Sequence, residues 1–373
     1  MDNFVVSARK YRPSSFGNVV GQDSLITTLK NAIQRKQLAQ AYLFCGPRGV
    51  GKTTCARIFA KTINCLNPTP EMEACNECES CKALIQQRSF NIHELDAASN
   101  NTIDGIRSLI EQVRIPPQIG KYSVYIIDEV HMLSTQAFNA FLKTLEEPPA
   151  HAIFILATTE KHKIIPTILS RCQIYDFNRI KVEDTVKYLE FIANEEKIAY
   201  EVEALNIIAQ KADGAMRDAL SIFDQVVSYS EDNITYQKVI ENLNVLDYQY
   251  YFTLTENFLQ ADYANTLKVY DELLSKGFDP QQFISGLSDH FRSLLVCKDP
   301  QTSHILEVGA AIAERYIQFA ADSSPEFLIK ALDVINQTDI TFRQSSNQRL
   351  HVELMLIRLS GLNQKKKVAS TNG

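Results

Sequence analysis

The segment Gly46-Pro-Arg-Gly-Val-Gly-Lys-Thr53 constrains the fold more than any other part of the chain. It fits the pattern G-x-x-x-x-G-K-[ST], follows an apolar run and precedes the helical stretch TCARIFAKTIN. In that context glycines let backbone N–H groups surround phosphates at the positive end of a helix. We expect Lys52 to neutralise the β- and γ-phosphates of ATP and the Thr53 hydroxyl to bind Mg²⁺. The predicted nucleotide contacts of this loop are Gly46, Pro47, Arg48, Gly49, Val50, Gly51, Lys52, Thr53 and Thr54. An ordinary glycine-rich turn is the alternative, which the flanking strand and helix disfavour.

Short apolar runs in the first 180 residues predict the sheet that carries this loop. The runs are AYLFCG at 41–46, NIHELDA at 91–97, SVYIIDE at 123–129, AIFILATT at 152–159 and QIYDF at 173–177. They alternate little and are separated by helical stretches, which is typical of parallel strands covered on both faces. We therefore predict an α/β P-loop core with a five-stranded parallel sheet at 1–180.

The remainder of the chain is predicted to be helical. Helices are predicted at 182–196, 201–212 and 216–229, and Thr235 suits the N-cap of a further short helix. From 244 to 363 apolar residues recur at three- and four-residue spacing. The sequence thus predicts a small helical domain at 181–243, an all-α domain at 244–363 and a polar tail at 364–373.

The net charge and the hydropathy of the chain bear on nucleic-acid binding and on cellular location. The net charge of −6 argues against a surface that binds nucleic acid everywhere, although it leaves room for a local basic patch. The N-terminus has no cationic start followed by an apolar stretch, and the longest apolar runs are strand-sized. We expect a soluble cytoplasmic protein without membrane association, in which cysteines are thiols or metal ligands.

Four cysteines between the first helix and the second strand predict a metal site. Cys65, Cys75, Cys78 and Cys81 form C-x9-C-x2-C-x2-C at 65–81. Four thiolates with two such tight spacings suit tetrahedral Zn²⁺ in a structural site. An iron–sulfur cluster of ferredoxin type would need a further cysteine at position 85, where the chain has Ile85. Unligated thiols are the other alternative.

Two carboxylates end the run that precedes residue 130. Asp128 and Glu129 follow Val124-Tyr-Ile-Ile. A strand this apolar tolerates them at its exposed carboxyl end, where ligands of open α/β sheets bind. We expect Asp128 to hold Mg²⁺, directly or through water, and Glu129 to polarise the attacking water as a general base. A solvated strand end without function is the alternative.

Three further residues stay ambiguous on sequence grounds alone. Thr158 ends the next apolar run, where its hydroxyl suits either a contact to the γ-phosphate or a capping role. Arg171 in Ser-Arg-Cys and Arg217 in Gly-Ala-Met-Arg-Asp suit either stabilisation of phosphoryl-transfer charge or surface ion pairs.

A specific set of segments occurs in order along the chain. They are ARKYRP at 8–13, VGQ at 20–22, GPRGVGKT at 46–53, the four-cysteine insert, LDAASNN at 95–101, YIIDEVHMLS at 125–134, FNAFLKTLEEPP at 138–149, ATTE at 157–160, ILSRC at 168–172 and GAMRDALS at 214–221. This set resembles the AAA+ clamp-loader ATPases, and most closely the gamma/tau subunits of bacterial DNA polymerase III. The resemblance is strong over about residues 4–245 and implies a lid for the second domain and a ring-like collar for the third.

The resemblance also implies roles for individual residues. Tyr11, Arg12, Pro13, Val19 and Val20 would line the adenine pocket.

For the three ambiguous residues, the resemblance favours function. Thr158 would sense the γ-phosphate, and Arg217 would reach the nucleotide from the lid of the same subunit. Arg171 would act in trans, on ATP held by a neighbouring subunit, and that role requires an oligomer.

At the level of function, the resemblance implies an ATP-hydrolysing motor subunit that loads the sliding clamp onto primed DNA during replication. Its partners would be further copies within a clamp-loader pentamer, the delta and delta-prime subunits, the beta sliding clamp and primed template DNA. The chain would be a subunit of the DNA-directed DNA polymerase III holoenzyme, a nucleotidyltransferase, without carrying the polymerase active site itself. The longer form of the family contacts the replicative helicase and the polymerase through C-terminal domains, and the sequence up to residue 373 gives no support for such contacts.

Two other functions stay open at this point. One is a different DNA-remodelling AAA+ motor, of the helicase or branch-migration type. The other is a non-catalytic clamp-loader scaffold similar to delta-prime, although that subunit lacks a working phosphate loop.

Overall fold

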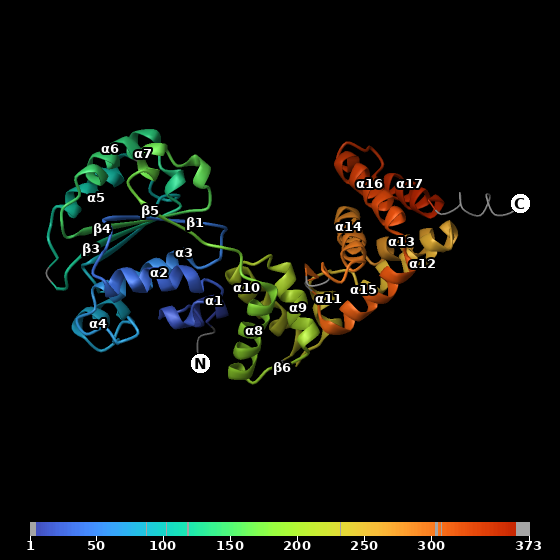
Figure 1. The fold of residues 1–373 in the computed structure, drawn as a ribbon, viewed down its shortest axis with the longest axis horizontal. Helices are drawn as coiled ribbons and strands as arrows, with labels where there is room; N and C mark the ends of the chain where they lie inside the picture. Colours follow the sequence, from blue (N-terminus) through green and yellow to red (C-terminus); the bar gives the residue numbers. More distant parts are fainter. Residues whose placement is uncertain are drawn as a thin grey trace, which may run out of the picture. The chain divides into compact units, whose positions relative to one another are not determined.

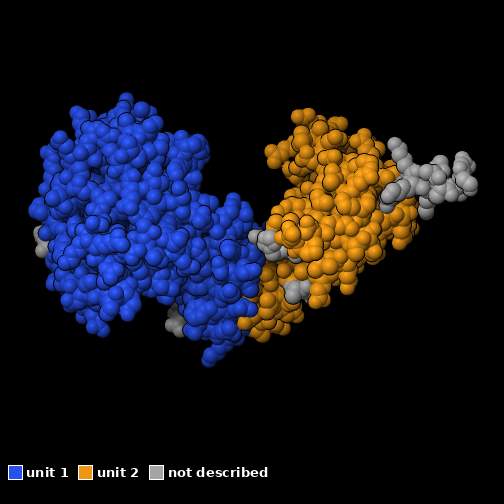
Figure 2. Space-filling view, viewed as in Figure 1, with its two compact units in different colours: residues 1–198, 208–225 blue, residues 199–207, 226–373 orange. Residues whose placement is uncertain are grey.

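The computed structural model describes residues 5–86, 88–101, 103–117, 119–231, 233–302, 305–306 and 308–362. The chain divides into two compact units (Figure 2), of which the first comprises Met1–Ile198 with Ile208–Gln225 and the second Ala199–Ile207 with Val226–Gly373. The predicted polar tail at 364–373 lies outside the described residues. Within those residues, no helix combines the length and apolar character that a membrane crossing needs.

A five-stranded sheet forms the centre of the first unit (Figure 1). Its strands are β1 (Ala41–Cys45), β2 (Ile92–Asp96), β3 (Ser123–Asp128), β4 (Ala152–Thr158) and β5 (Gln173–Asp176). They pair in the order β2-β3-β4-β1-β5, and every pairing is parallel. The predicted α/β core is therefore confirmed, including the number and direction of its strands.

Both faces of the sheet are buried, which explains why its strands read as continuous apolar runs. In β1, Leu43 and Cys45 join the apolar cluster on one face, whereas Tyr42 and Phe44 join the cluster on the other. The helices α2 (Asp23–Gln34) and α3 (Lys52–Ile63) cover the second of these faces. The first face is covered by α5 (Ile103–Val113), α6 (Thr135–Glu146) and α7 (Pro166–Leu169), which lie together on one side of the sheet in Figure 1.

The strand order brings the predicted catalytic segments to one edge. Because the strands are parallel, all their carboxyl ends point the same way, and loops after them meet at that edge. Cys45 at the end of β1 is paired with Thr158 at the end of β4. Asp128 ends β3, the neighbour of β4 on its other side.

Shorter elements and three longer helices complete this part of the chain. They are α1 (Ser7–Lys10), η1 (Phe16–Asn18), α4 (Glu79–Ile85), η2 (Val130–Met132), η3 (Lys161–Lys163), α8 (Val182–Glu196), α9 (Val202–Lys211) and α10 (Met216–Ser230). The last three match the helices predicted at 182–196, 201–212 and 216–229.

Over its described residues, the second unit is helical apart from one pair of very short strands. β6 (Ala199–Tyr200) and β7 (Asn233–Ile234) pair in parallel, although no strand was predicted in this region. The helices are α11 (Tyr236–Asn242), α12 (Tyr248–Leu259), α13 (Tyr263–Ser275), α14 (Pro280–Val296), α15 (Ala310–Asp322), α16 (Pro325–Phe342) and α17 (Gln348–Gly361). Thr235 caps α11 as predicted, since its side chain accepts a hydrogen bond from the Lys238 N–H.

A separate apolar cluster joins α12 to α17. Close packing within it explains one glycine, because a Cβ on Gly286 would lie 2.0 Å from the Tyr251 hydroxyl. The buried His290 side chain forms the polar centre of this cluster. Its Nε2 lies 3.0 Å from the Thr255 hydroxyl and its Nδ1 lies 3.0 Å from the Tyr316 hydroxyl.

Candidate functional site

The phosphate loop connects β1 to α3 through backbone conformations that favour glycine. Gly49 and Gly51 have φ angles of 78° and 101°, in the left-handed region where a side chain causes strain. Gly46 is required for space, since a Cβ there would lie 2.5 Å from the Phe177 carbonyl oxygen. Lys52 begins α3, and its Nζ donates to the Gly46 and Pro47 carbonyl oxygens at 2.8 and 2.7 Å. Burial lowers the pKa of this ammonium group.

The predicted magnesium ligands are in direct contact. Thr53 Oγ1 donates to Asp128 Oδ2 at 2.6 Å, which joins the first turn of α3 to the end of β3. The other carboxylate oxygen of Asp128 accepts the Glu129 N–H at 2.9 Å. Oxygen ligands of this kind, a hydroxyl and a carboxylate, are those that Mg²⁺ prefers. The donor set therefore fits a magnesium ion bound together with a nucleotide.

Glu129 is held by residues beyond β3. Thr159 Oγ1 donates to Glu129 Oε2 at 3.1 Å, and His131 Nδ1 lies 3.4 Å from the same oxygen. His131 also lies 3.0 Å from the Thr158 hydroxyl through Nδ1 and 3.2 Å from Glu160 Oε2 through Nε2. The sequence did not assign His131 or Thr159 to the site, because their partners come from a different strand.

A cavity of about 370 Å³ lies against these residues. It brings together most of the predicted nucleotide contacts: Tyr11, Arg12, Pro13, Val19, Val20, Arg48, Gly49, Val50, Gly51, Lys52, Thr53, Thr54, Asp128, Glu129 and Arg217. Residues that the sequence did not single out complete its wall, among them Ile180, Tyr188 and Leu220. Their positions depend on the packing of α8 and α10, which no local motif specifies.

Of the residues predicted to bind the nucleotide or to act in its hydrolysis, four lie outside the lining of this cavity: Gly46, Pro47, Thr158 and Arg171. Gly46 and Pro47 contact it indirectly through the Lys52 ammonium group. Thr158 is fully buried, and its hydroxyl accepts the Glu160 N–H at 3.0 Å. That bond is the capping role considered for Thr158, and the contact with His131 links it to Glu129.

The N-terminal segment forms one wall of the cavity. Arg12 Nε donates to Thr54 Oγ1 at 3.1 Å, and burial together with the nearby Arg57 lowers the pKa of the Arg12 guanidinium. Tyr188 on α8 donates its hydroxyl hydrogen to the Tyr11 carbonyl oxygen at 2.8 Å. The Tyr11 hydroxyl in turn contacts Glu196, the last residue of α8. The segment therefore connects the phosphate loop with α8.

The two predicted arginines occupy different surroundings. Arg217 lies on the cavity wall, and its backbone N–H donates to the Gly49 carbonyl oxygen at 3.3 Å. Arg171 instead donates to the Thr167 carbonyl oxygen and to Glu146 Oε1, both at 2.8 Å. An arginine outside the cavity of its own chain has to act on another subunit if it acts on a nucleotide.

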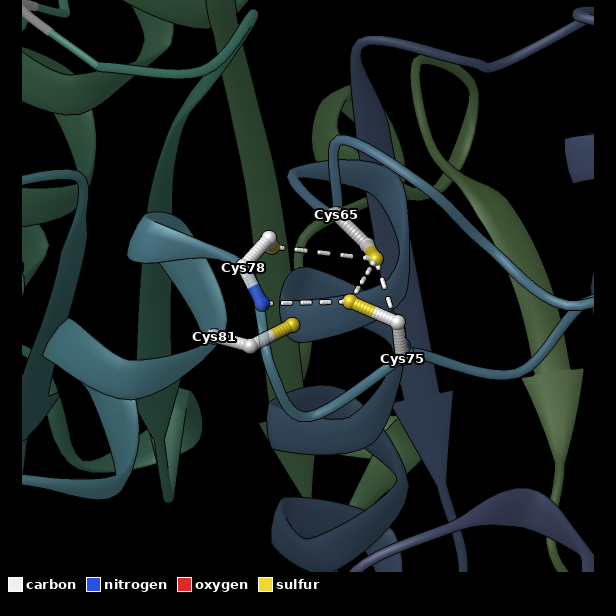
Figure 3. A group of neighbouring side chains, drawn as sticks. All are labelled: Cys65, Cys75, Cys78 and Cys81. Atoms are coloured by element: carbon white, nitrogen blue, oxygen red, sulfur yellow. Dashed lines mark hydrogen bonds between the residues drawn. The ribbon is translucent and has the colours of Figure 1, made fainter.

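The four cysteines of the insert form one cluster (Figure 3). Their sulfur atoms all lie within 4.8 Å of one another. Cys65 Sγ is 3.4 Å from Cys75 Sγ and 4.0 Å from Cys78 Sγ. Hydrogen bonds from the Cys78 and Glu77 N–H groups lower the pKa of the Cys75 thiol to about 6, which favours the thiolate form that binds metals.

This geometry fits a zinc ion. With Zn–S bonds of about 2.3 Å, the sulfur atoms of a tetrahedral site lie about 3.8 Å apart. The distances from Cys65 Sγ to Cys75 Sγ and Cys78 Sγ, 3.4 and 4.0 Å, lie on either side of that value. Cys65, Cys75, Cys78 and Cys81 could therefore hold zinc with little rearrangement.

Comparison with known proteins adds independent information. Family models described as DNA polymerase III delta subunit, DNA polymerase III clamp loader subunit ATPase lid domain, and DNA polymerase III subunits gamma and tau domain III match residues 21–181, 184–232 and 234–370. DNA polymerase III subunit tau of Bacillus subtilis (strain 168) is 40% identical over 352 residues, which cover 94% of this chain and 62% of that protein. DNA polymerase III subunit gamma of Buchnera aphidicola subsp. Baizongia pistaciae (strain Bp) is 32% identical and covers 97% of this chain and 98% of that protein. The chain belongs to the DNA polymerase III gamma/tau family.

Membership of the gamma/tau family confirms the resemblance found in the ordered motifs. The chain spans less than two thirds of some gamma/tau relatives, such as the Bacillus subtilis tau subunit at 62%. Among solved structures, the RuvB Holliday junction branch migration motor of Thermotoga maritima aligns with a TM-score of 0.48 at 20% identity, over 65% of this chain and 78% of that one.

Proposed function

We propose that this gamma/tau chain binds ATP and hydrolyses it as the motor subunit of a clamp loader, which places the sliding clamp on primed DNA. The observation that carries the proposal is the convergence of Lys52, Thr53, Asp128 and Glu129 on one cavity at the carboxyl edge of the sheet. A scaffold subunit without ATPase activity would not need all four groups in this arrangement.

The phosphate loop side of the cavity would bind the phosphates, and the side formed by the N-terminal segment would bind the base. Lys52 would turn its ammonium group from the Gly46 and Pro47 carbonyl oxygens toward the β- and γ-phosphates. Backbone N–H groups of the loop 48–51 would surround the phosphates at the start of α3. Val19 and Val20 would contact the adenine ring, and Arg217 would reach the phosphates from α10.

Hydrolysis would depend on Glu129. Its carboxylate would orient a water molecule for attack on the γ-phosphate and accept its proton. Magnesium held by Thr53 and Asp128 would supply charge neutralisation between the phosphates. Thr158 would sense the γ-phosphate through its contact with His131, which lies beside Glu129.

The remaining roles concern the assembly. Residues 181–243 would form the lid and 244–363 a collar through which copies of this chain join delta and delta-prime subunits in a pentamer. Arg171 would stabilise charge on ATP bound to a neighbouring subunit. Zinc on the four cysteines would stabilise the insert, the protein would act in the cytoplasm, and nucleotidyl transfer would belong to other subunits of the holoenzyme.

The test is ATP hydrolysis by the chain alone and then with delta, delta-prime, sliding clamp and primed DNA. We expect strong stimulation by the complete set and loss of turnover in Lys52→Ala, with Lys187→Ala on the exposed side of α8 as the control. Turnover stimulated by bare DNA and indifferent to the clamp would instead indicate a motor of the helicase or branch-migration type. Unchanged activity of Lys52→Ala would indicate a scaffold.

A further inference from the structure

One carboxylate of the cysteine insert reaches out of the insert. Glu73 Oε2 accepts the Phe16 N–H at 2.9 Å, and Glu73 Oε1 accepts the Gly17 N–H at 3.0 Å. The same Oε1 lies 2.8 Å from Lys30 Nζ on α2. All three contacts join Glu73 to residues far away in the sequence, so they fix the insert against the N-terminal segment.

The two amides that Glu73 binds belong to a turn that leads into the nucleotide cavity. Phe16 and Gly17 open η1, and Phe16 is 1% exposed within the core beneath it. Val19 and Val20 follow this turn directly and line the cavity. The position of this apolar wall is therefore set in part by the carboxylate of Glu73.

The position of Glu73 depends in turn on the cysteine cluster. No helix or strand is assigned between Asn64 and Cys78, all of which the structure describes, so few backbone bonds define this loop. A turn fixes it locally, because the Thr69 N–H donates to the Glu73 carbonyl oxygen at 2.9 Å. The thiols of Cys65 and Cys75, 3.4 Å apart, close the loop at its base. A metal that joins these thiols would hold Glu73 in place.

We propose that Glu73 is a positioning residue through which the cysteine cluster controls nucleotide affinity. Metal bound to the cluster keeps Glu73 on the Phe16 and Gly17 amides, and this keeps Val19 and Val20 in place for the base. The insert then acts on the first step of the ATPase cycle as well as on stability. This inference rests on the proposed function, since it concerns binding to the same cavity.

The alternative is that Glu73 only forms a surface ion pair with Lys30. Exposed ion pairs contribute little to stability and hold their side chains only loosely. Here the Glu73 and Lys30 side chains are only 18% and 25% exposed, and two backbone amides share the carboxylate. Hydrogen bonds to a charged acceptor in such surroundings are stronger, and loss of the carboxylate leaves both amides to find other partners.

The first test measures the affinity of the full chain for Mg-ADP by isothermal titration calorimetry, so that turnover does not interfere. We expect Glu73→Ala to weaken binding about three- to tenfold, a part of what charge-assisted hydrogen bonds contribute, and Glu73→Gln to weaken it less. Glu79→Gln, an exposed residue of the same insert, is the matched control and should bind as the wild type does. In steady-state assays KM for ATP should rise while kcat stays unchanged. Wild-type affinity in Glu73→Ala at full zinc content would overturn the proposal.

The second test asks whether the metal acts through Glu73. Zinc per chain is measured before and after treatment with a chelator, and Mg-ADP affinity is measured on both forms. We expect chelation to weaken ADP binding in the wild type and to add little in Glu73→Ala. An equal further loss in Glu73→Ala would show that the metal acts by another route and would overturn the coupling. Failure of the zinc-loaded wild type to bind ADP at all would contradict the proposed function instead, so the two failures are distinguishable.

Discussion

Glu129, the proposed general base, is oriented by a few individual contacts. It has a φ angle of 47°, in a region that costs energy for a residue with a side chain, and it directs the chain from β3 into η2. The hydroxyl of Thr159 and the ring of His131 both lie beside its Oε2 atom. The proposed general base is therefore held in one orientation before the nucleotide binds.

His131 is the first residue at which this arrangement can be tested. In His131→Ala, Glu129 loses one of its two neighbours, and we expect turnover to fall about ten- to a hundredfold because of misplacement, with ATP affinity little changed. The measurement is steady-state hydrolysis in the full assembly together with calorimetric binding of Mg-ADP. His162→Ala, an exposed histidine on η3, should behave as the wild type. Equal loss of kcat and of binding would assign His131 a purely structural role.

At this scale the sequence predicted the residues that belong to local motifs. Lys52 and Thr53 stand at fixed spacing in a loop, and Asp128 stands at the end of an apolar strand, so their type and neighbours reveal them. His131 and Glu73 could not be found this way. Their proposed roles rest on contacts to Thr158 and to Phe16, and a single sequence carries no signal of such pairings.

Among the elements, the cysteine insert owes the smallest part of its stability to its own packing. Cys81 at the start of α4 is 1% exposed, whereas much of the preceding loop is accessible to solvent. A loop with so little apolar surface to bury gains its stability from cross-links.

Cys78→Ser is expected to lower the zinc content and the thermal unfolding temperature of the chain, because a hydroxyl is a poor replacement for a thiolate ligand. Metal analysis and calorimetry would measure both effects. Cys172→Ser, which alters a half-buried thiol outside the cluster, should keep its zinc. A wild-type zinc content in Cys78→Ser would contradict the assignment of a metal site.

In the helical unit, the buried His290 side chain lies where α12, α14 and α15 meet. Thr255 Oγ1 donates its hydrogen to the Tyr251 carbonyl oxygen. In its contact with His290 Nε2 the same hydroxyl can therefore only be the acceptor. Nε2 therefore carries a proton, and in the neutral ring the Tyr316 hydroxyl donates to Nδ1. Burial, helped by the positive charge of Arg315, lowers the pKa of His290 to about 3.

This pKa predicts a loss of stability in mild acid. Below about pH 6.5 the unfolded chain gains a proton at His290 that the folded unit does not bind, so the free energy of unfolding falls by up to about 1.4 kcal/mol per pH unit. Denaturant titrations between pH 6.5 and 5, where few carboxylates titrate, would measure the slope. His290→Gln keeps a donor and an acceptor, and its slope should be shallower. Identical slopes would show that His290 is protonated in the folded unit.

Elements with regular apolar patterns were predicted well, and the exceptions have physical reasons. The boundaries of β1 and α8 agree with the sequence to within a residue, because apolar runs and helical periodicity extend over their whole lengths. The pair β6 and β7 was missed because two residues are too few to display alternation. The order of the five strands was not predicted, because it depends on pairing between segments far apart in the sequence.

At the scale of the whole molecule, the position of Arg171 predicts that one chain suffices for nucleotide binding and that turnover needs a second chain. Every group proposed to bind the nucleotide lies in the first unit of one chain, yet Arg171 is tied to Glu146 away from that cavity. An isolated chain would then bind ATP with a complete pocket and hydrolyse it slowly. Assembly would supply the arginine that the pocket lacks.

Arg171→Ala should therefore keep Mg-ADP affinity and lose about a thousandfold or more of turnover in the assembled complex, as for other arginines supplied in trans. Arg107→Ala, which removes an exposed arginine of α5, provides the control. Hydrolysis by the complete assembly would be measured with each variant. Normal turnover of Arg171→Ala would refute a role in trans.

The order of strands in the sheet also has a consequence for how the protein is made. Both neighbours of β1 in the sheet, β4 and β5, are synthesised after it, and Ala41 pairs with Phe154. At about 5–20 residues per second, a ribosome needs roughly ten seconds to make the stretch between them. During that time the apolar strand that leads into the phosphate loop has no partner. The nascent chain therefore exposes this segment until β4 emerges, and chaperones that bind such segments would act on it in that interval.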